Sequence, residues 1–338
     1  MNVSIGVVAF NEGKVMDGIL TDILNQTYSH EKLEIILVDS ASTDNTKSIL
    51  CEFKEKHKDE FRNIQVLDNP ERLQSCGWNV VFKNFTSDVV IRVDAHAHIP
   101  KDFIEKNMKC IESGEMVCGG PTPSIVTDST PWKETLLLCE SSMFGSSIAP
   151  YRNSTGKKYV KSISHGAYRR EVIEKVGMFN HLLGRTEDNE YHYRIRQAGY
   201  NICYENELVS YQHARATLKK MASQKFGNGY WIGLTSGVCP GCISLYHFVP
   251  LAFVGGIIFT TILALLGYSF LAKLMWILYW SLSIIMAVMS VRGKSFNKYN
   301  LLIPFIFFVF HFCYGIGTLK GILYMPFWRR KYKEKING

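Results

Sequence analysis

The chain falls into two parts that differ in how polar and apolar residues are distributed. Up to Cys242, short apolar runs alternate with charged and polar stretches, as in a soluble domain with a normal charged surface. From Leu245 to Phe327 charged residues are rare and apolar residues dominate. Because long apolar stretches are typical of membrane helices, this pattern predicts a soluble domain followed by a membrane domain.

The first part alternates between two kinds of periodicity. Short runs rich in β-branched residues predict buried strands, and stretches with apolar residues at helical spacing predict helices between them. The connections are too long for hairpins, so we expect an α/β fold with a doubly wound, mostly parallel sheet that binds ligands at the carboxyl ends of its strands. The predicted strands are Val3–Ala9, Leu33–Val38, Ile64–Leu67 and Val89–Val93, and the predicted helices are Lys14–Leu24, Thr43–Lys54 and Gln74–Phe85.

The middle of the soluble part, from Phe103 to Gln212, is less regular. Gly119-Gly120-Pro121 interrupts it, and small and polar residues between Ser141 and Gly156 predict a mobile loop. Helical spacing returns later, and a short strand follows it. We predict helices at Tyr168–Val176 and Asp188–Ala198 and a strand at Leu208–Tyr211.

Two segments of the apolar part, Leu245–Leu266 and Ala272–Val291, each approach the ~20 residues that span a bilayer. The short linker between them predicts a helical hairpin. Arg292, Lys294 and Lys298 follow the second segment, which places that end in the cytosol by the positive-inside rule. The soluble domain then lies on the cytoplasmic side as well, and the protein is expected to be a multi-pass protein of the cell membrane.

A third apolar stretch, Leu301–Tyr324, allows two topologies. If it spans the bilayer, the basic tail after it lies outside, against the positive-inside rule. If it lies in the interface, the tail stays in the cytosol, and the polar residues His311, Tyr314 and Lys320 favour this second arrangement. The domains expected are therefore a catalytic domain at 1–240, a membrane domain at 241–327 and a basic tail at 328–338.

Charge limits the binding partners that we expect, and cysteine content indicates the redox compartment. The formal net charge is +8, yet no Lys/Arg-rich helix or nucleic-acid module is recognisable, so nucleic acid is not an expected partner. Anionic lipids and a nucleotide diphosphate account for the charge better, and the tail from Trp328 to Lys333 suits a lipid surface. Nine cysteines without paired spacing favour a reducing cytosol, and the lone Cys239-Pro-Gly-Cys242 motif lacks the context of a redox or metal site.

The strongest local motif follows the fourth predicted strand. It reads Arg92-Val93-Asp94-Ala95-His96-Ala97-His98. A carboxylate and an imidazole two residues apart at a strand end can face one ion. This ligand set suits Mn²⁺ better than Mg²⁺, because Mg²⁺ binds nitrogen ligands less readily. The alternative is that Asp94 caps the next helix while the histidines lie on a loop, and the motif alone leaves both interpretations open.

Two further polar clusters lie at predicted element ends. Asn11 and Glu12 follow the first strand and Asp39 follows the second, where such groups can bind a base and a ribose, although turns also favour these residue types. Glu187 and Asp188 open a predicted helix. They can act as helix caps, or they can raise each other's pKa and provide a general base.

Together these motifs resemble the family-two glycosyltransferases of the GT-A fold, and most closely the succinoglycan-type exopolysaccharide branch. The resemblance covers nearly the whole chain. Each motif is weak alone, but several in the expected order are specific. The matching segments are Ala9–Glu12, Val38–Asp44, Asn69–Asn79, Asp94–His96, Gly166–Arg170, Glu187-Asp188, Arg215–Leu218 and Gln224–Trp231.

The resemblance implies a role for each matching residue. Donor binding would fall to Ala9, Asn11, Glu12, Asp39, Arg72, Asn79 and Asp94, with a UDP-sugar as the donor. Asp94 and His96 would bind Mn²⁺ or Mg²⁺. His213 would be an extra metal or phosphate ligand, although a buried structural histidine is an alternative. Asp188 would deprotonate the acceptor hydroxyl in an inverting hexosyl transfer.

Two departures from the family pattern matter. His96 replaces the second aspartate of the usual DxD motif, which favours Mn²⁺. The Gln-x-x-Arg-Trp motif of processive synthases is absent, and Gln224–Asn228 stands near its place, which favours transfer of a single sugar. The expected acceptor is a polyprenyl-diphosphate-linked saccharide in capsule or exopolysaccharide biosynthesis, with Arg169, Arg170 and Glu187 as candidate contacts to acceptor or phosphate.

Other protein classes fit less well. The His96-x-His98 pair matches metal-dependent hydrolases, but their fold needs eight strand–helix units and only about four are predicted here. A nucleotidyltransferase should carry a Gly-rich, Lys-bearing phosphate loop, which this sequence lacks. A catalytically silent membrane scaffold remains an alternative, against which the intact Asp94, His96 and Asp188 speak.

Overall fold

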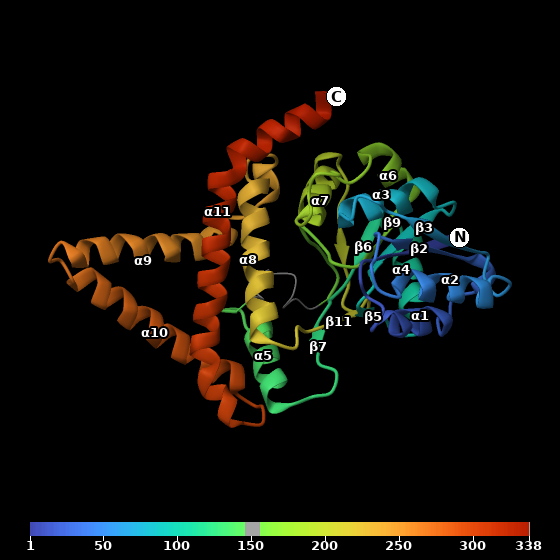
Figure 1. Ribbon diagram of the computed structural model, residues 1–338. Coiled ribbons are helices and arrows are strands. Elements are labelled where there is room, and N and C mark those ends of the chain that lie inside the picture. The colour runs from blue at the N-terminus through green and yellow to red at the C-terminus, as the bar shows by residue number, and fades with distance from the viewer. Residues whose placement is uncertain (146–155, 338) are drawn as a thin grey trace. The chain divides into compact units, whose positions relative to one another are not determined.

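The four predicted strands near the amino terminus are present in the protein, which is described here by a computed structural model (Figure 1). The first, second and fourth are dominated by Val, Ile and Leu, which can be buried on both faces of a parallel sheet. The structure describes residues 1–145 and 156–337, so most of the loop predicted at Ser141–Gly156 lies outside the described residues. The first elements are β1 (Val3–Ala9), α1 (Met16–Leu24), β2 (Leu33–Asp39), α2 (Thr46–His57), β3 (Asn63–Asp68), α3 (Gln74–Asn84) and β4 (Val89–Asp94).

The later strands complete an eight-stranded mixed sheet. Its strand order is β3-β2-β1-β4-β9-β6-β10-β8. Pairs among β1 to β4 are parallel, whereas β9 runs antiparallel to both β4 and β6. The elements that follow β4 up to residue 213, apart from β7 (Ser124–Ile125) and α5 (Pro131–Ser141), are β5 (Ala97–His98), α4 (Phe103–Glu112), β6 (Val117–Gly119), β8 (Lys158–Tyr159), β9 (Gly166–Arg169), α6 (Arg170–Val176), α7 (Glu187–Gln197), β10 (Cys203–Tyr204) and β11 (Tyr211–His213). β5 and β11 belong to a second, smaller sheet.

Two predictions in this region need correction. The helix predicted at Tyr168–Val176 begins only at Arg170, because Tyr168 and Arg169 extend strand β9. The strand predicted at Leu208–Tyr211 is instead β11, Tyr211–His213, so His213 lies in the strand rather than after it. In both places the strand is short and lies next to polar residues, so the sequence shows no apolar run that would predict it.

Helices cover both faces of the sheet. Val3, Ile5 and Val7 of β1 point to one face and join a buried cluster with apolar residues of α1, α2 and α4. The opposite face packs on α3 and α7 (Figure 1). Gly6 marks this second face, because a Cβ there would meet Val81 Cγ1 at 2.6 Å. Burial on both faces leaves the strand ends as the place where polar groups of the sheet can meet a ligand.

The chain forms two compact units, Met1–Pro123 with Ser154–His213 and Ser124–Asn153 with Ala214–Gly338. The division falls after His213, whereas the sequence predicted a catalytic domain ending at residue 240. The reason is α8, a helix that the sequence pattern missed and that packs along α11. The second unit contains β7 (Ser124–Ile125), α5 (Pro131–Ser141), α8 (Leu218–Thr235), α9 (Val249–Leu265), α10 (Phe270–Val291) and α11 (Ile303–Asn337).

Three segments of the second unit are long and apolar enough to cross a membrane: Leu245–Leu265, Phe270–Val291 and Lys298–Lys331. They correspond to the three predicted apolar segments. The third is longer than predicted, because α11 continues without a break through the basic tail to Asn337. His311 of α11 lies 3.0 Å from the Tyr279 hydroxyl of α10 and 2.6 Å from the Phe144 carbonyl oxygen. These contacts account for a polar side chain within an apolar helix.

Glycines allow α8 and α11 to pack closely. Gly229 and Gly233 of α8 face the backbone of α11, and Gly317 and Gly321 of α11 face the backbone of α8. On both helices the glycines are four residues apart, the spacing of helix pairs that pack in membranes. The contact therefore depends on the absence of side chains at these positions.

We expect Gly233→Ala to lower the stability of the second unit by about 1–3 kcal/mol, the usual cost of overpacking. A Cβ at Gly233 would lie 2.6 Å from the Thr318 carbonyl oxygen and 2.7 Å from the Ile322 amide nitrogen, and neither backbone atom can move away without separating the helices. Thermal unfolding of the detergent-solubilised protein measures the effect. Gly255→Ala in α9 is the matched control, because a Cβ there meets nothing within 4 Å. Equal melting temperatures for the two variants would contradict the packing argument.

Candidate active site

The carboxyl ends of three neighbouring strands bring predicted site residues together. In the parallel register, Ala9 of β1 pairs with Asp39 of β2, and Val8 of β1 pairs with Asp94 of β4. Asp39 and Asp94 therefore flank the end of β1 on either side. In a doubly wound sheet this edge is where ligands bind.

The loops after β1 and β2 are bonded to each other. The Thr43 amide donates to Asn11 Oδ1 at 2.7 Å, and the Asn11 amide donates to Ser42 Oγ at 3.0 Å. The Glu12 amide donates to Thr46 Oγ1 at 2.9 Å. Asn11 at φ +54° and Ala41 at φ +55° adopt left-handed backbone conformations, which cost energy for residues other than glycine and gather at functional sites.

The Asp39 carboxylate has one oxygen without a hydrogen-bond partner among the described residues. Its Oδ2 accepts the Ser42 amide at 3.2 Å, while Oδ1 is buried and has no hydrogen-bond partner among the described residues. A buried carboxylate oxygen without a partner is costly unless a ligand donates to it. A ribose hydroxyl or a base N–H supplies such a donor.

The Asp94 carboxylate is held by side chains from two other elements. Gln74 Nε2 donates to Asp94 Oδ1 at 3.2 Å, and His165 Nε2 lies 3.3 Å from Asp94 Oδ2. His165 is itself fixed by Ser210 Oγ, 2.9 Å from its Nδ1. Burial would raise the pKa of Asp94, but the bond to His165 and the charges of His165, Arg92 and His96 hold it well below its usual range. Asp94 is therefore ionised at neutral pH.

The histidines after β4 separate into two environments. His96 Nδ1 lies 3.3 Å from Glu12 Oε1, at the strand-end site, whereas His98 Nδ1 lies 2.6 Å from Asp22 of α1. The hydrolase alternative needs both rings on one ion, and the Asp22 pair of His98 does not support it. Strands β5 and β11 pair antiparallel, with Tyr211 opposite His98. Continued to the next positions, this register brings His213 opposite His96, and burial together with the charge of His96 lowers the pKa of His213.

A buried ion pair connects strand β4 to the start of α7. Arg92 Nη2 lies 3.2 Å from Glu187 Oε1, and both side chains are about 5% exposed. The guanidinium also packs on the rings of Trp78 and Phe179. Burial and the neighbouring Asp188 raise the pKa of Glu187 to about 7, although Arg92 lowers it. Because Arg92 also interacts with the charges of Asp94 and Asp188, one buried cation links the predicted metal-binding carboxylate to the predicted general base.

We expect Arg92→Met to destabilise the first unit by about 3–5 kcal/mol, because it leaves Glu187 buried without a counterion. Adding Glu187→Gln should recover part of the loss, since the amide carries no charge. The loss should be larger at about pH 8 than at about pH 6, because Glu187 can take up a proton at the lower pH. A double-mutant cycle measured by thermal unfolding at both pH values tests this. Additive effects that do not depend on pH would contradict the pairing.

Other predicted residues lie elsewhere or have structural contacts. Arg169 pairs with Val89 at the amino end of β4, opposite to the Asp94 end, and its guanidinium donates to the carbonyl oxygens of Ile111 and Glu115. Arg170 donates to the carbonyl oxygens of Phe85 and Ser87. These placements do not support the predicted contact of the two arginines with acceptor or phosphate.

Asn79 and Arg72, which were predicted to bind the nucleotide-sugar donor, make contacts within the protein. Asn79 donates to the Phe179 carbonyl oxygen at 2.9 Å and accepts the Phe179 amide at 2.8 Å, so it anchors the segment that leads to α7. Arg72 adopts φ +59°, and its guanidinium lies 6.0 Å from the Phe10 ring centre at the loop after β1. Arg72 therefore lies beside the loop after β1, while the amide of Asn79 contacts backbone.

Three residues that position the site were not predicted. Arg92 stands two residues before Asp94 in the same motif, and a charged residue in an otherwise apolar strand could have marked it. His165 directly precedes the Gly166–Arg170 motif but shows no periodicity. Gln74 was assigned to a helix start and to the matching segment Asn69–Asn79, but it was given no role in the site. Their partners lie 20 to 95 residues away along the chain, which local patterns do not reveal.

Comparisons with known proteins agree with this geometry. The sequence model described as "Glycosyl transferase family 2" matches residues 4–177, more than half of the chain. A Methanococcus voltae protein named dolichyl N-acetyl-alpha-D-glucosaminyl phosphate 3-beta-D-2,3-diacetamido-2,3-dideoxy-beta-D-glucuronosyltransferase is 23% identical over 327 residues, which cover 95% of this chain and 97% of that protein. The succinoglycan biosynthesis protein ExoA of Rhizobium meliloti is 26% identical over 201 residues, 58% of each chain.

A solved structure shows the same fold. The mannosyltransferase PcManGT from Pyrobaculum calidifontis, in complex with GDP-Man and Mn²⁺, superposes with a TM-score of 0.56 at 18% identity, over 94% of this chain and 87% of that one. The likeness confirms the GT-A fold that the sequence predicted. The two sequence relatives carry names from different biosynthetic systems, so the matches do not single out the succinoglycan branch.

Proposed function

Because the chain belongs to glycosyl transferase family 2, we propose that it transfers a single sugar from a UDP-sugar to a lipid-linked saccharide and inverts the anomeric centre. The observation that carries this proposal is the strand register, which aligns Asp39 and Asp94 beside the end of β1. Arg92 links Asp94 electrostatically to the carboxylates at the start of α7. Donor, metal and base functions therefore have candidate groups at one edge of one sheet.

The donor nucleotide would lie over the loops after β1 and β2. Ala9, Asn11, Glu12 and Asp39 would contact the base and the ribose, and the unpartnered Oδ1 of Asp39 supports a hydrogen bond from the ligand. Arg72 would lie beside them. We propose uracil as the base from the sequence motifs. PcManGT was solved with GDP-Man, so guanine is the base to test against it.

The residue types at this edge of the sheet suit a divalent cation. Asp94 is an ionised carboxylate, and His96 in the turn after β4 and His213 of β11 supply imidazoles, a mixed oxygen and nitrogen set that suits Mn²⁺ better than Mg²⁺. Asp94, His96 and His213 would hold the ion, and His165 and Gln74 would orient Asp94. A bound Mn²⁺ would offset the negative charge that develops on the departing diphosphate.

Asp188 would act as the general base. It lies in the first turn of α7, and its Oδ1 accepts the Asn189 amide at 2.8 Å, which fixes the carboxylate at the helix end. The preceding Thr186 adopts φ +67°, a left-handed conformation that turns the chain into α7. In an inverting transfer Asp188 takes the proton from the acceptor hydroxyl as that oxygen attacks the anomeric carbon and the bond to the UDP oxygen breaks.

The acceptor is proposed to be held at a membrane. The three long apolar helices support a multi-pass membrane protein. Arg292, Lys294 and Lys298 after the second helix support a catalytic unit in the cytosol by the positive-inside rule. The name of the Methanococcus voltae relative contains a dolichyl-linked sugar phosphate, which supports a lipid-linked acceptor. A polyprenyl diphosphate carrying a saccharide, in capsule or exopolysaccharide biosynthesis, is the acceptor we propose. Arg169 and Arg170 are left out of its binding site because of their backbone contacts.

A transfer assay tests the proposal. Purified full-length protein is incubated with Mn²⁺, a panel of UDP-sugars and a polyprenyl-diphosphate-linked saccharide, and the lipid product is identified by mass spectrometry and NMR. We expect a single added sugar with inverted anomeric configuration. Retention of configuration would contradict the mechanism, and nucleotide binding without any transfer would favour the scaffold alternative.

A further inference from the structure

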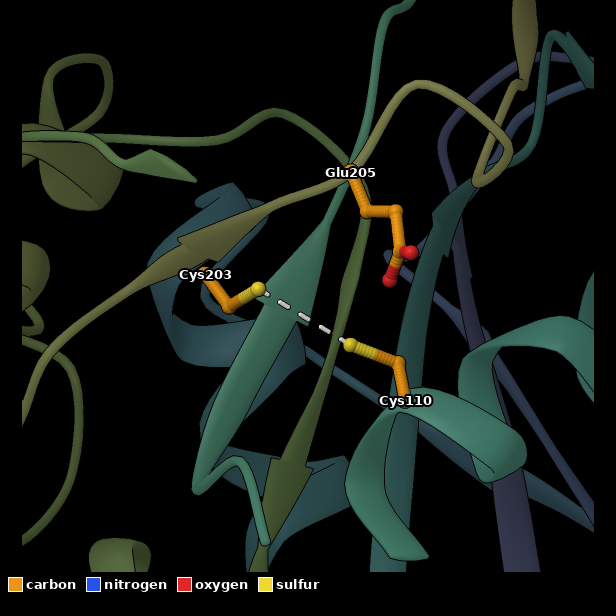
Figure 2. Close-up of side chains that lie close together, drawn as sticks. All are labelled: Cys110, Cys203 and Glu205. Carbon is orange, nitrogen blue, oxygen red and sulfur yellow. Dashed lines mark hydrogen bonds between the residues drawn. The ribbon is translucent and has the colours of Figure 1, made fainter. Parts of the chain in front are cut away.

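A buried cluster of thiols lies in the first unit and shares no residue with the candidate active site described above. Cys110 of α4 and Cys203 of β10 are 4% and 0% exposed, and their sulfur atoms lie 3.9 Å apart. The Glu205 carboxylate joins them, so that one ligand atom from each of the three residues lies within 4.8 Å of the others. Figure 2 shows the three side chains pointing toward one another.

The sheet register explains why these groups converge. Cys203 of β10 pairs with Cys118 of β6 in the parallel register, so their side chains lie side by side on one face of the sheet. Glu205 is two residues after Cys203, and Cys110 lies on α4, which packs against β6. The Cys118 thiol is therefore a third sulfur beside the cluster, and it donates weakly to Asn107 Oδ1 of α4 at 3.7 Å.

The distances fit a tetrahedral ion better than a covalent link. Zn–S bonds of 2.3 Å at a tetrahedral angle place two sulfur atoms about 3.8 Å apart, close to the 3.9 Å found here. A disulfide would need a separation of about 2.05 Å, and all nine cysteines of the chain are free. Two thiols and a carboxylate form a ligand set of the kind that zinc prefers.

We propose that Cys110, Cys203 and Glu205 bind a thiophilic divalent cation, Zn²⁺, at a structural site separate from the donor metal. The ion would connect α4 to the end of β10, the strand that leads through Glu205 to β11 and His213. It would thereby stabilise the segment that carries a proposed donor-site residue. The thiols lose their protons when they bind the ion.

The first experiment uses the full-length protein, purified in detergent with a non-thiol reductant, stripped with EDTA and titrated with Co²⁺. Cobalt bound to thiolate produces a strong near-ultraviolet charge-transfer absorption, which the Asp and His ligands of the donor site cannot produce. We expect saturation at one Co²⁺ per chain for this absorption and a loss of at least about tenfold in Cys110→Ser and in Cys203→Ser. Cys51→Ser, at an exposed cysteine of α2, is the matched control and should keep the full absorption.

A second kind of variant keeps the test valid if the cysteine variants misfold. Glu205 is only partly buried, so Glu205→Gln should fold. It keeps both thiolates, so the absorption per bound Co²⁺ should stay the same while the Kd for Zn²⁺ rises at least about tenfold. The proposal is overturned if the wild-type protein shows no thiolate absorption, if Cys203→Ser keeps it, or if Glu205→Gln binds Zn²⁺ as tightly as wild type. None of these readouts depends on glycosyl transfer, so the result is independent of the proposed function.

Discussion

Replacing Asp188 by asparagine is expected to lower kcat by about 10²–10⁴-fold, the usual contribution of a general base. The amide has nearly the same shape and can still accept the Asn189 amide hydrogen that now bonds to Asp188 Oδ1. It cannot take the proton from the acceptor hydroxyl. Affinity for the donor nucleotide should therefore stay close to that of wild type, since the change removes an interaction made during reaction.

The matched control is Glu171→Gln, which also removes a carboxylate from the first turn of a helix, α6, at an exposed position. It should leave kcat unchanged. Steady-state kinetics for transfer, together with nucleotide affinity from calorimetry, separate the two parameters. An unchanged kcat in Asp188→Asn would exclude Asp188 as the base. A large loss of nucleotide affinity would instead place Asp188 in donor binding.

Replacing Asp94 by asparagine is expected to lower kcat/KM by about 10³-fold or more, because charge stabilisation by a metal contributes several kcal/mol. The structure keeps Asp94 ionised, since His165 and the charges of Arg92 and His96 outweigh the effect of burial on its pKa. The amide lacks that negative charge but can still bond to Gln74 and His165. The Mn²⁺ concentration needed for half-maximal activity should rise steeply.

Asp68→Asn is the control for this experiment. Asp68 also ends a strand, β3, at the same edge of the sheet, but it is exposed and pairs with Lys47 at 2.7 Å. Its removal should leave the Mn²⁺ dependence unchanged, since exposed ion pairs contribute little. If Asp94→Asn kept the wild-type Mn²⁺ response, the proposed metal site would be wrong.

The parallel half of the sheet was predictable because each strand is long and apolar. β1, β2 and β4 are buried on both faces, so Val, Ile and Leu dominate their sequences. The other half, in which β9 and β8 run antiparallel to their neighbours, was not predictable in the same way. β8 and β10 contain two residues each, too few to show a period. Helix α8 was missed because its glycines, which usually disfavour helices, serve close packing against α11.

The site residues that could be predicted from the sequence are those at the ends of predicted strands. Asp39 and Asp94 stand at such ends, and the motifs around them gave their expected roles before any geometry. Residues whose partners lie far away along the chain could not be predicted from the local sequence. His165 reaches Asp94 across 71 residues and Arg92 reaches Glu187 across 95, and neither partnership leaves a trace in local composition. The same holds for the pairing of Cys203 with Cys118 under α4.

The measurement that tests the central claim most directly is nucleotide binding by the wild-type protein. UDP, GDP and CMP are titrated separately by calorimetry, each with Mn²⁺ and again in EDTA. We expect UDP to bind most tightly and EDTA to remove most of its affinity. Absence of binding by all three nucleotides in the presence of Mn²⁺ would contradict a nucleotide-sugar site at the ends of β1, β2 and β4.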